Sequence, residues 1–197
     1  INKGNDLTVA GNFTNRGTVT LNSDNNEFSS LIVEGTATGD ITYERYINNE
    51  GANEWDLIGS PVDGQSITSF VTTNSGTIAT SPSGVYSAIG IYDNSDNSWE
   101  NYGTGSAWET GDFELGKGYQ MATTSGDTME FTGSVASSDQ TYSVINNDAN
   151  GGRRWNLVSN PFPSYINANE DADGTNNFLS VNGDSGIIDT EYLAVYG

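Results

Sequence analysis

The sequence predicts an all-β protein, a jelly-roll-like β-sandwich with a tandem repeat, preceded by a short β-solenoid-like or meander segment. Short apolar segments alternate with polar residues, and Gly, Asn, Ser and Thr separate them as turn formers. The 4 Trp, 10 Tyr and 7 Phe are sufficient to cover a core. No segment shows a convincing helical stripe, and residues 164–180 are the best candidate for a helical turn.

Residues 1–40 carry a short period. An apolar pair separated by one residue recurs every twelve residues, at Leu7/Val9, Val19/Leu21 and Leu31/Val33. Strands of about five residues joined by Asn and Gly turns fit this spacing. Stacked coils of a β-solenoid are typical of such repetition, although an antiparallel meander permits it as well. Both alternatives remain open for residues 1–40.

A second repeat acts over a longer distance. The segment Glu-Trp-Asp-Leu-Ile-Gly-Ser-Pro-Val at 54–62 reappears at 154–162 as Arg-Trp-Asn-Leu-Val-Ser-Asn-Pro-Phe. Trp, Leu, a β-branched residue and Pro keep their offsets, which indicates a tandem duplication. Because Trp55 and Trp155 recur at matched positions, we expect both in the core.

The duplication suggests how the chain is organised. A first β-sandwich repeat covers residues 41–141, and a truncated second repeat covers 142–197 and packs with the first. An aromatic strand at 88–93 follows the first copy, and a similar strand at 192–197 follows the second. The sequence ends before any counterpart of the later strands of the first repeat.

The charge and the missing residue types exclude several classes of function. The 197 residues include 6 Lys+Arg and 26 Asp+Glu, a formal net charge of −20, with neither His nor Cys. This excludes a Ser-His-Asp triad, a thiol nucleophile, a His or thiolate metal site and a disulfide framework. So acidic a chain repels nucleic acid and anionic membranes, and its apolar runs are shorter than the roughly 20 residues that span a bilayer. We therefore expect no nucleic-acid partner and no membrane insertion.

One motif suggests a family. The run Trp-Asn-Leu-Val-Ser-Asn-Pro-Phe-Pro-Ser at 155–164 resembles a motif in the β-sandwich region of large secreted surface proteins of the Bacteroidetes. The Gly-Lys-Gly-Tyr run at 116–119 resembles another strand of that region, and residues 29–46 are similar to the junction where the Asn/Gly-rich repeats of those proteins end. The first copy departs from the motif, because it has Ser60-Pro61 in place of Asn-Pro.

The resemblance implies a setting more than a chemistry. Such regions typically precede the C-terminal sorting domain of type IX secretion, so an extracellular or cell-surface location and type IX export of a longer parent protein are implied. They accompany adhesins and polysaccharide-degrading enzymes alike, and the resemblance therefore names no activity.

Two loops have the composition of a cation site. Asn169, Asp171 and Asp173 alternate and are closed by Gly174, a spacing that can wrap Ca²⁺. The twelfth position of that loop is Ser180 instead of the Glu of an EF-hand, and an exposed turn made by Asx side chains is the alternative.

The second loop contains Asp93, Ser95 and Asn97 just after a predicted strand. Its oxygen-bearing side chains suit a cation, but the same string is typical of a hairpin loop, and we favour that interpretation. From the spacing in the first loop, calcium is the expected cofactor, in a structural role.

Trp99, Tyr102 and Trp108 surround a Gly/Ser-rich hairpin and could stack on sugar rings, although aromatic side chains equally build sandwich cores. Paired carboxylates can hydrolyse glycosides, and Glu109, Asp112 and Glu114 lie close in sequence, but a chain this acidic yields such clusters by composition alone. We expect no catalytic site.

Taken together, these features predict a non-catalytic structural or adhesive module of a large extracellular bacterial surface protein, stabilised by calcium. The alternative is a carbohydrate-binding module attached to a secreted polysaccharide-degrading enzyme. The expected partners are the remainder of a longer chain or a neighbouring surface protein and, in the alternative, an extracellular polysaccharide.

Overall fold

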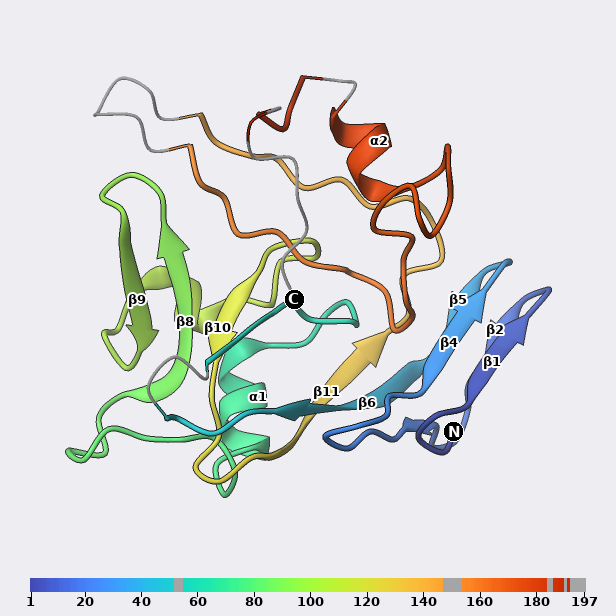
Figure 1. Cartoon of the computed structure of the whole chain (residues 1–197). Helices are drawn as coiled ribbons and strands as arrows, with labels where there is room; N and C mark the ends of the chain where they lie inside the picture. The colour runs from blue at the N-terminus through green and yellow to red at the C-terminus, as the bar shows by residue number, and fades with distance from the viewer. Residues whose placement is uncertain (52–54, 147–153, 184–185, 190, 192–197) are drawn as a thin grey trace. The chain divides into compact units, whose positions relative to one another are not determined.

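Short strands make up most of the regular structure, as predicted. A computed structural model describes residues 1–51, 55–146, 154–183, 186–189 and 191 (Figure 1). The chain divides into two compact units, Ile1–Ser164 and Tyr165–Gly197. The strands are β1 (Asp6–Val9), β2 (Phe13–Thr14), β3 (Thr20–Leu21), β4 (Ser30–Val33), β5 (Ala37–Thr38), β6 (Asp40–Ile47), β7 (Asp56–Ile58), β8 (Ser87–Asp93), β9 (Ser98–Tyr102), β10 (Tyr119–Met121) and β11 (Asp127–Ser134). The sequence-based prediction of an all-β, sandwich-like fold is confirmed.

The first forty residues form coils. β1 pairs with β4 and β2 with β5, both in parallel, and the partners Leu7 and Leu31 lie 24 residues apart in sequence. One coil of 24 residues therefore spans two of the twelve-residue periods. Of the middle pair, Leu21 belongs to β3, which pairs in parallel with β6. Corner side chains join successive coils, since Asn12 Oδ1 accepts a hydrogen bond from the Thr36 N–H at 3.0 Å. Parallel pairing favours the solenoid alternative over the antiparallel meander.

Two larger sheets follow the coils. One has the strand order β7-β10-β8-β9 and is antiparallel throughout, and the other has the order β11-β6-β3. β6 and β11 are the longest pair, antiparallel from Asp40↔Ser134 to Ile47↔Asp127. Ile47, Phe131 and Met121 from these strands are fully buried and belong to one apolar core.

A helix that the sequence analysis missed completes this core. α1 (Ile67–Thr73) begins after Ser66, whose Oγ accepts a hydrogen bond from the Ser69 N–H at 3.3 Å. The ring centroid of its buried Phe70 lies 4.6 Å from that of Phe131 in β11 and 5.1 Å from that of Phe113. The rings of Phe113 and Tyr119 of β10 have centroids 4.9 Å apart. The sequence pattern does not indicate this helix, because it has only seven residues and most of them are Thr, Ser or Val, which have low helix propensity.

Two further short helices are present. The 3₁₀ helix η1 (Ala107–Thr110) lies between β9 and β10. In the second unit, α2 (Phe178–Gly183) begins after Asn177, whose Oδ1 accepts a hydrogen bond from the Ser180 N–H at 2.9 Å. The helical turn expected within 164–180 thus forms at the far end of that range and continues beyond it.

The second copy of the duplicated motif contacts both the coils and a sheet. Gly118 N–H donates to Leu157 O at 2.9 Å, and Ser159 N–H donates to Gly116 O at 2.8 Å. Further along, Pro163 O accepts a hydrogen bond from the N–H of Leu31 in β4 at 2.7 Å. The described residues of 142–164, part of the predicted second repeat, therefore belong to the same compact unit as the first repeat.

The duplication is visible in local geometry. In each copy the side chain before Pro accepts the N–H two residues later, Ser60 from Val62 at 3.3 Å and Asn160 from Phe162 at 3.0 Å. The residue after each Trp also accepts a backbone N–H from the preceding segment. Asp56 Oδ2 accepts the Asn48 N–H at 2.7 Å, and Asn156 Oδ1 accepts the Ile145 N–H at 2.9 Å. The two copies thus share the same turn.

The two Trp residues of the copies differ in burial. Trp55 is partly buried against the core, whereas Trp155 is 57% exposed, so the expectation that both lie in the core is wrong for Trp155. β7 of the first copy already occupies the edge of β10, and the second copy reaches only the residues just before β10, through a bridge between Lys117 and Val158. The predicted strand at 192–197 lies outside the described residues.

Candidate functional site

One face of the four-stranded sheet is directed away from the core. Ile89 and Met121 point inward and are fully buried. Side chains alternate between the faces of a strand, so Gly90 and Gln120, their neighbours in sequence, belong to the opposite face. The register places Asn101 of β9 opposite Gly90, and Leu57 of β7 opposite Gln120. We call this face, made of Leu57, Gly90, Tyr92, Trp99, Asn101 and Gln120, the outer face.

The outer face carries an aromatic pair at its edge strand. Tyr92 and Trp99 are cross-strand partners whose rings meet edge to face, with centroids 5.5 Å apart. The Tyr92 hydroxyl donates to Asn97 Oδ1 at 2.8 Å, and Asn97 has a positive φ of 61° in the β8–β9 turn. Trp99 is 43% exposed. The turn thus holds Tyr92 in place, and Tyr92 supports the indole of Trp99.

Next to this pair lie two amides and a glycine. Gln120 Nε2 donates to Asn101 Oδ1 at 2.8 Å across Gly90. A Cβ atom at Gly90 would lie 2.6 Å from Asn101 Oδ1 and 2.9 Å from Gln120 Nε2. The missing side chain therefore leaves room for the two amides to meet across three strands.

The three aromatic residues predicted to contact sugar do not form one patch. Trp99 lies on the outer face, whereas Tyr102 and Trp108 of η1 pack on the core side, with ring centroids 6.2 Å apart. The odd spacing between Trp99 and Tyr102 along β9 accounts for the separation, because residues three apart in a strand point to opposite faces. The sequence analysis missed the partners of Trp99, namely Tyr92, Asn101 and Gln120.

Two acidic side chains near η1, Glu109 and Glu100, accept hydrogen bonds from a turn at residues 104–106. Buried Glu109 Oε1 accepts hydrogen bonds from the N–H groups of Thr104 and Gly105, both at 2.9 Å. Burial raises the pKa of Glu109, but these bonds and others from the same turn outweigh it and leave the pKa lowered. The pKa of Glu100 is also lowered, chiefly by hydrogen bonds from Ser106 and Thr104. Both carboxylates are therefore ionised acceptors and lack the raised pKa of a general acid.

The predicted cation loop at 93–98 is the turn between β8 and β9. Asp93 Oδ1 accepts hydrogen bonds from the N–H and the Oγ of Ser95, at 2.8 and 2.7 Å, and these bonds lower the pKa of Asp93. With Asn97 bound to Tyr92, the contacts of Asp93, Ser95 and Asn97 are those of the hairpin alternative.

Asn94, in the same loop, has a role that sequence reasoning did not suggest. Its side chain is buried, and its Nδ2 donates to Ile145 O at 3.0 Å and to Trp155 O at 3.3 Å. These bonds attach the second copy to the end of β8. An Asn in a polar loop gives no sequence signal for such a long-range contact.

The loop at 169–174 also forms Asx turns. Asn169 Oδ1 accepts a hydrogen bond from the Asp171 N–H at 3.2 Å. Asp173 Oδ1 accepts the N–H groups of Thr175 and Asn176 at 2.9 Å, and these bonds, that from Asn176 foremost, lower the pKa of Asp173. Among the described residues no three His, Cys, Asp or Glu side chains form a group that could hold a metal ion.

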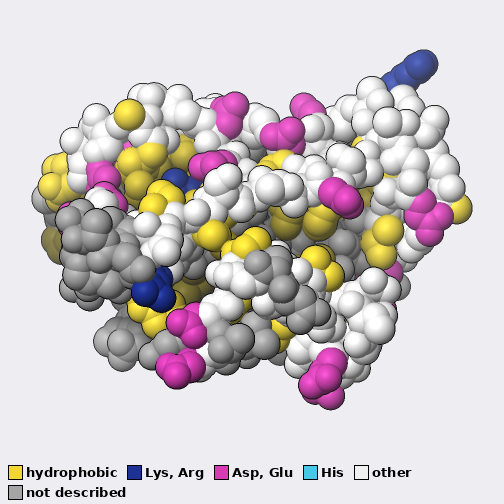
Figure 2. Space-filling view, turned by 90° about the horizontal axis from the view of Figure 1, so that it is seen from above, with side chains coloured by type: hydrophobic (Ala, Val, Ile, Leu, Met, Phe, Trp, Pro, Cys, Tyr) yellow, Lys and Arg dark blue, Asp and Glu magenta, His cyan; other side chains and the backbone are white. Residues whose placement is uncertain are grey.

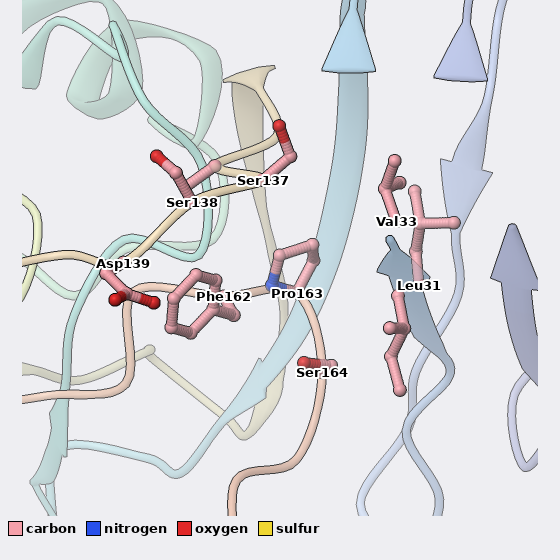
Figure 3. A pocket seen from close by; sticks show the side chains of 10 residues that line it. Leu31, Val33, Ser137, Ser138, Asp139, Phe162, Pro163 and Ser164 are labelled. Carbon is pink, nitrogen blue, oxygen red and sulfur yellow. The ribbon is translucent and has the colours of Figure 1, made fainter. Parts of the chain in front are cut away.

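A groove lies between the coils and the second copy. Leu31 and Val33 line one side, with Phe162 and Pro163 opposite and residues 137–139 above them (Figure 3). Its volume is about 230 Å³, below the roughly 300–1,000 Å³ of ligand pockets. We therefore assign it no ligand.

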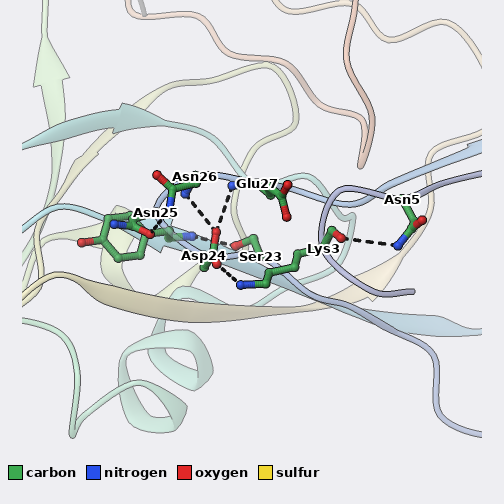
Figure 4. Close-up of polar contacts among 8 residues, drawn as sticks. Lys3, Asn5, Ser23, Asp24, Asn25, Asn26 and Glu27 are labelled. Atoms are coloured by element: carbon green, nitrogen blue, oxygen red, sulfur yellow. Dashed lines mark hydrogen bonds and ion pairs between the residues drawn. The ribbon is translucent and has the colours of Figure 1, made fainter.

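A surface ion pair ties the start of the chain to the turn at 22–28. Lys3 Nζ pairs with Asp24 Oδ2, and Asp24 Oδ1 accepts the N–H groups of Asn26 and Glu27 at 2.9 Å (Figure 4). The Lys3 contact, together with the two N–H bonds, lowers the pKa of Asp24 to about 2. This arrangement secures the first coil and resembles no catalytic geometry.

The surface offers little basic character. On the face drawn in Figure 2, Asp and Glu side chains are scattered singly, and few Lys or Arg side chains appear among them. Within the described part of the chain, no helix has both the length and the apolar character needed to cross a bilayer.

The chain was compared with protein-family models, curated proteins and solved structures. No family model, no curated protein and no solved structure matches it.

Proposed function

We propose that the chain is a non-catalytic structural module of a large extracellular surface protein, in which the second copy of the motif fastens a β-solenoid to a β-sandwich. One observation carries the proposal. Residues 155–164 form hydrogen bonds both to Gly116 and Gly118 beside the sheet and to Leu31 in the coils. A segment that bonds to both parts restricts their relative motion, as a structural or adhesive module under tension requires.

The partners in this proposal are further coils. Among the described strands, β1 pairs only with β4, and β2 pairs only with β5. Both β1 and β2 therefore have one backbone edge without a strand partner. Such an edge accepts another parallel strand, and solenoids stack by this pairing. The added coil would come from the same longer chain or from a neighbouring surface protein.

The location and the cofactor belong to the same proposal. The absence of Cys, the excess of acidic residues and the motif at 155–164 favour an extracellular or cell-surface protein exported by type IX secretion. Calcium would bind at the 169–174 loop, where Asn169 and the ionised Asp173 lie in one tight turn. It would stabilise that loop without taking part in chemistry.

Unfolding under force tests the fastening role. The chain is pulled from handles at residues 1 and 140, and the wild type should unfold its coils and sheets in one step. Gly118→Val should split that step in two, because a side chain there collides with Leu157. Gly76→Val is the matched control, since nothing lies within 4 Å of a Cβ atom at Gly76. Two separate steps in the wild type would contradict the proposal.

A further inference from the structure

We propose that the outer face binds a neutral polysaccharide of equatorially substituted hexopyranose units, with Trp99 as the stacking platform. Such rings present C–H groups on both faces, and these pack against an indole. Trp99 is 43% exposed, and its ring is supported edge-on by Tyr92, which Asn97 fixes through the 2.8 Å hydrogen bond. A platform held in place before binding loses little conformational entropy when a sugar docks.

The two amides provide the polar half of the site. Gln120 Nε2 and Asn101 Oδ1 bind each other, whereas Asn101 Nδ2 and Gln120 Oε1 have no hydrogen-bond partner among the described residues. One donor and one acceptor therefore remain available, the combination that a sugar hydroxyl uses when it accepts one hydrogen bond and donates another. Asn101 lies two residues from Trp99, about 7 Å along β9, within reach of a sugar stacked on the indole.

Gly90 leaves room for the amide pair above β8. Any side chain there would enter the space of the amide pair, because a Cβ atom would lie within 3 Å of both amides. A sugar ring stacked on Trp99 can therefore also contact the amide pair, which lies above β8.

Charge selects the kind of glycan. Asp93, next to Tyr92 in sequence, has a lowered pKa and is ionised, and the chain carries a formal net charge of −20. An anionic polysaccharide would be repelled, whereas a neutral one would not. This binding face does not require the structural role of the second copy, so either proposal can fail without the other.

Native affinity electrophoresis tests the assignment. The wild-type chain should be retarded by hydroxyethylcellulose, a neutral β-linked glucan, and not by alginate, a polyanion. Trp99→Ala should weaken the retardation constant by about three- to tenfold, the effect of losing one aromatic stack. Trp155→Ala is the matched control, because Trp155 is likewise an exposed Trp, at 57% against 43% for Trp99, but lies outside the four-stranded sheet. It should be retarded like the wild type.

A second measurement does not depend on variants. On addition of cellohexaose, the side-chain amide NMR signals of Asn101 and Gln120 should shift, while those of exposed Asn25 should not. The proposal is overturned if the wild type is not retarded by hydroxyethylcellulose, if alginate retards it equally, or if Trp99→Ala binds as the wild type does. Loss of binding in Trp155→Ala with retention in Trp99→Ala would assign the site to the second copy instead.

Discussion

Gly59 and Ser159, which occupy the same position in the two copies of the duplicated motif, lie against each other. A Cβ atom at Gly59 would collide with Ser159 Oγ and would lie 2.5 Å from Ser159 Cβ and 2.7 Å from Lys117 O. The turn of the second copy therefore rests where the turn of the first copy lacks a side chain. Two similar segments pack together because one of them has Gly at the point of closest approach.

Gly59→Ala should destabilise the protein by about 1–3 kcal/mol, the usual cost of overpacking. Chemical denaturation measures the loss. Gly76→Ala is the control and should change stability by no more than about 0.5–1 kcal/mol, because nothing lies near its Cβ position. Adding Ser159→Gly to Gly59→Ala should recover part of the loss, since the Lys117 carbonyl remains close. Equal stability of Gly59→Ala and the wild type would show that the two turns do not pack as described.

The bonds of Asn94 lead to a second prediction. Asn94→Ala removes the donor to Ile145 O and Trp155 O and leaves both carbonyls without it. Ile145 O keeps its hydrogen bond from Asn156 Nδ2, so we expect a loss of about 0.5–1.5 kcal/mol and faster amide hydrogen exchange at residues 155–159. Asn25→Ala, at an exposed turn position, should change neither quantity. Unaltered exchange at 155–159 in Asn94→Ala would refute the role of Asn94 as an anchor.

The sequence allowed the strand-rich class to be predicted and the repeated motif to be recognised, because each leaves a periodic or repeated pattern. For residues 1–40 it left a solenoid and a meander as alternatives, because a twelve-residue period fits both. It did not allow the exposure of the Trp155 side chain to be predicted. Two copies with the same motif cannot both pair with the same edge of β10, and the match between their sequences does not indicate which copy does. The outer face was only partly foreseen, because grouping aromatic residues by sequence proximity ignored the alternation that separates Trp99 from Tyr102.

The Lys3–Asp24 pair predicts behaviour in acid. The folded-state pKa of Asp24 is about 2 against an ordinary 3.8, so its stabilising contribution is complete above pH 4 and is lost as the pH falls towards 2. Carboxyl-detected NMR should show Asp24 titrating near pH 2. Lys3→Met should raise that midpoint, because the Lys3 contact is the largest cause of the shift, and Lys117→Met should leave it unchanged. A wild-type midpoint near 3.8 would show that the pair does not form in solution.

Tyr119 predicts behaviour in alkali. Burial raises the pKa of Tyr119 to about 12, against an ordinary 10.0. A raised pKa stabilises the folded state fully below pH 10, and this stabilisation, about 2–3 kcal/mol, is lost as the pH rises from 10 to 12. Denaturation at pH 9, 11 and 12 should show this loss in the wild type and a shallower one in Tyr119→Phe. Tyr165→Phe, at an exposed residue, should follow the wild type; a slope unaffected by Tyr119→Phe would contradict the assignment.

Calcium at the 169–174 loop gives the last prediction. If Ca²⁺ binds only the folded chain, stability rises by about 2.7 kcal/mol at a hundredfold excess over Kd, and EDTA reverses the gain. Asp171→Asn should abolish this increment while leaving the calcium-free stability unchanged, because the turn uses the backbone N–H of Asp171 and not its carboxylate. Asp127→Asn, at an exposed position of β11, should retain the increment. A melting curve unchanged by millimolar Ca²⁺ and by EDTA would show that the Asx turns at Asn169 and Asp173 hold the loop without a metal ion.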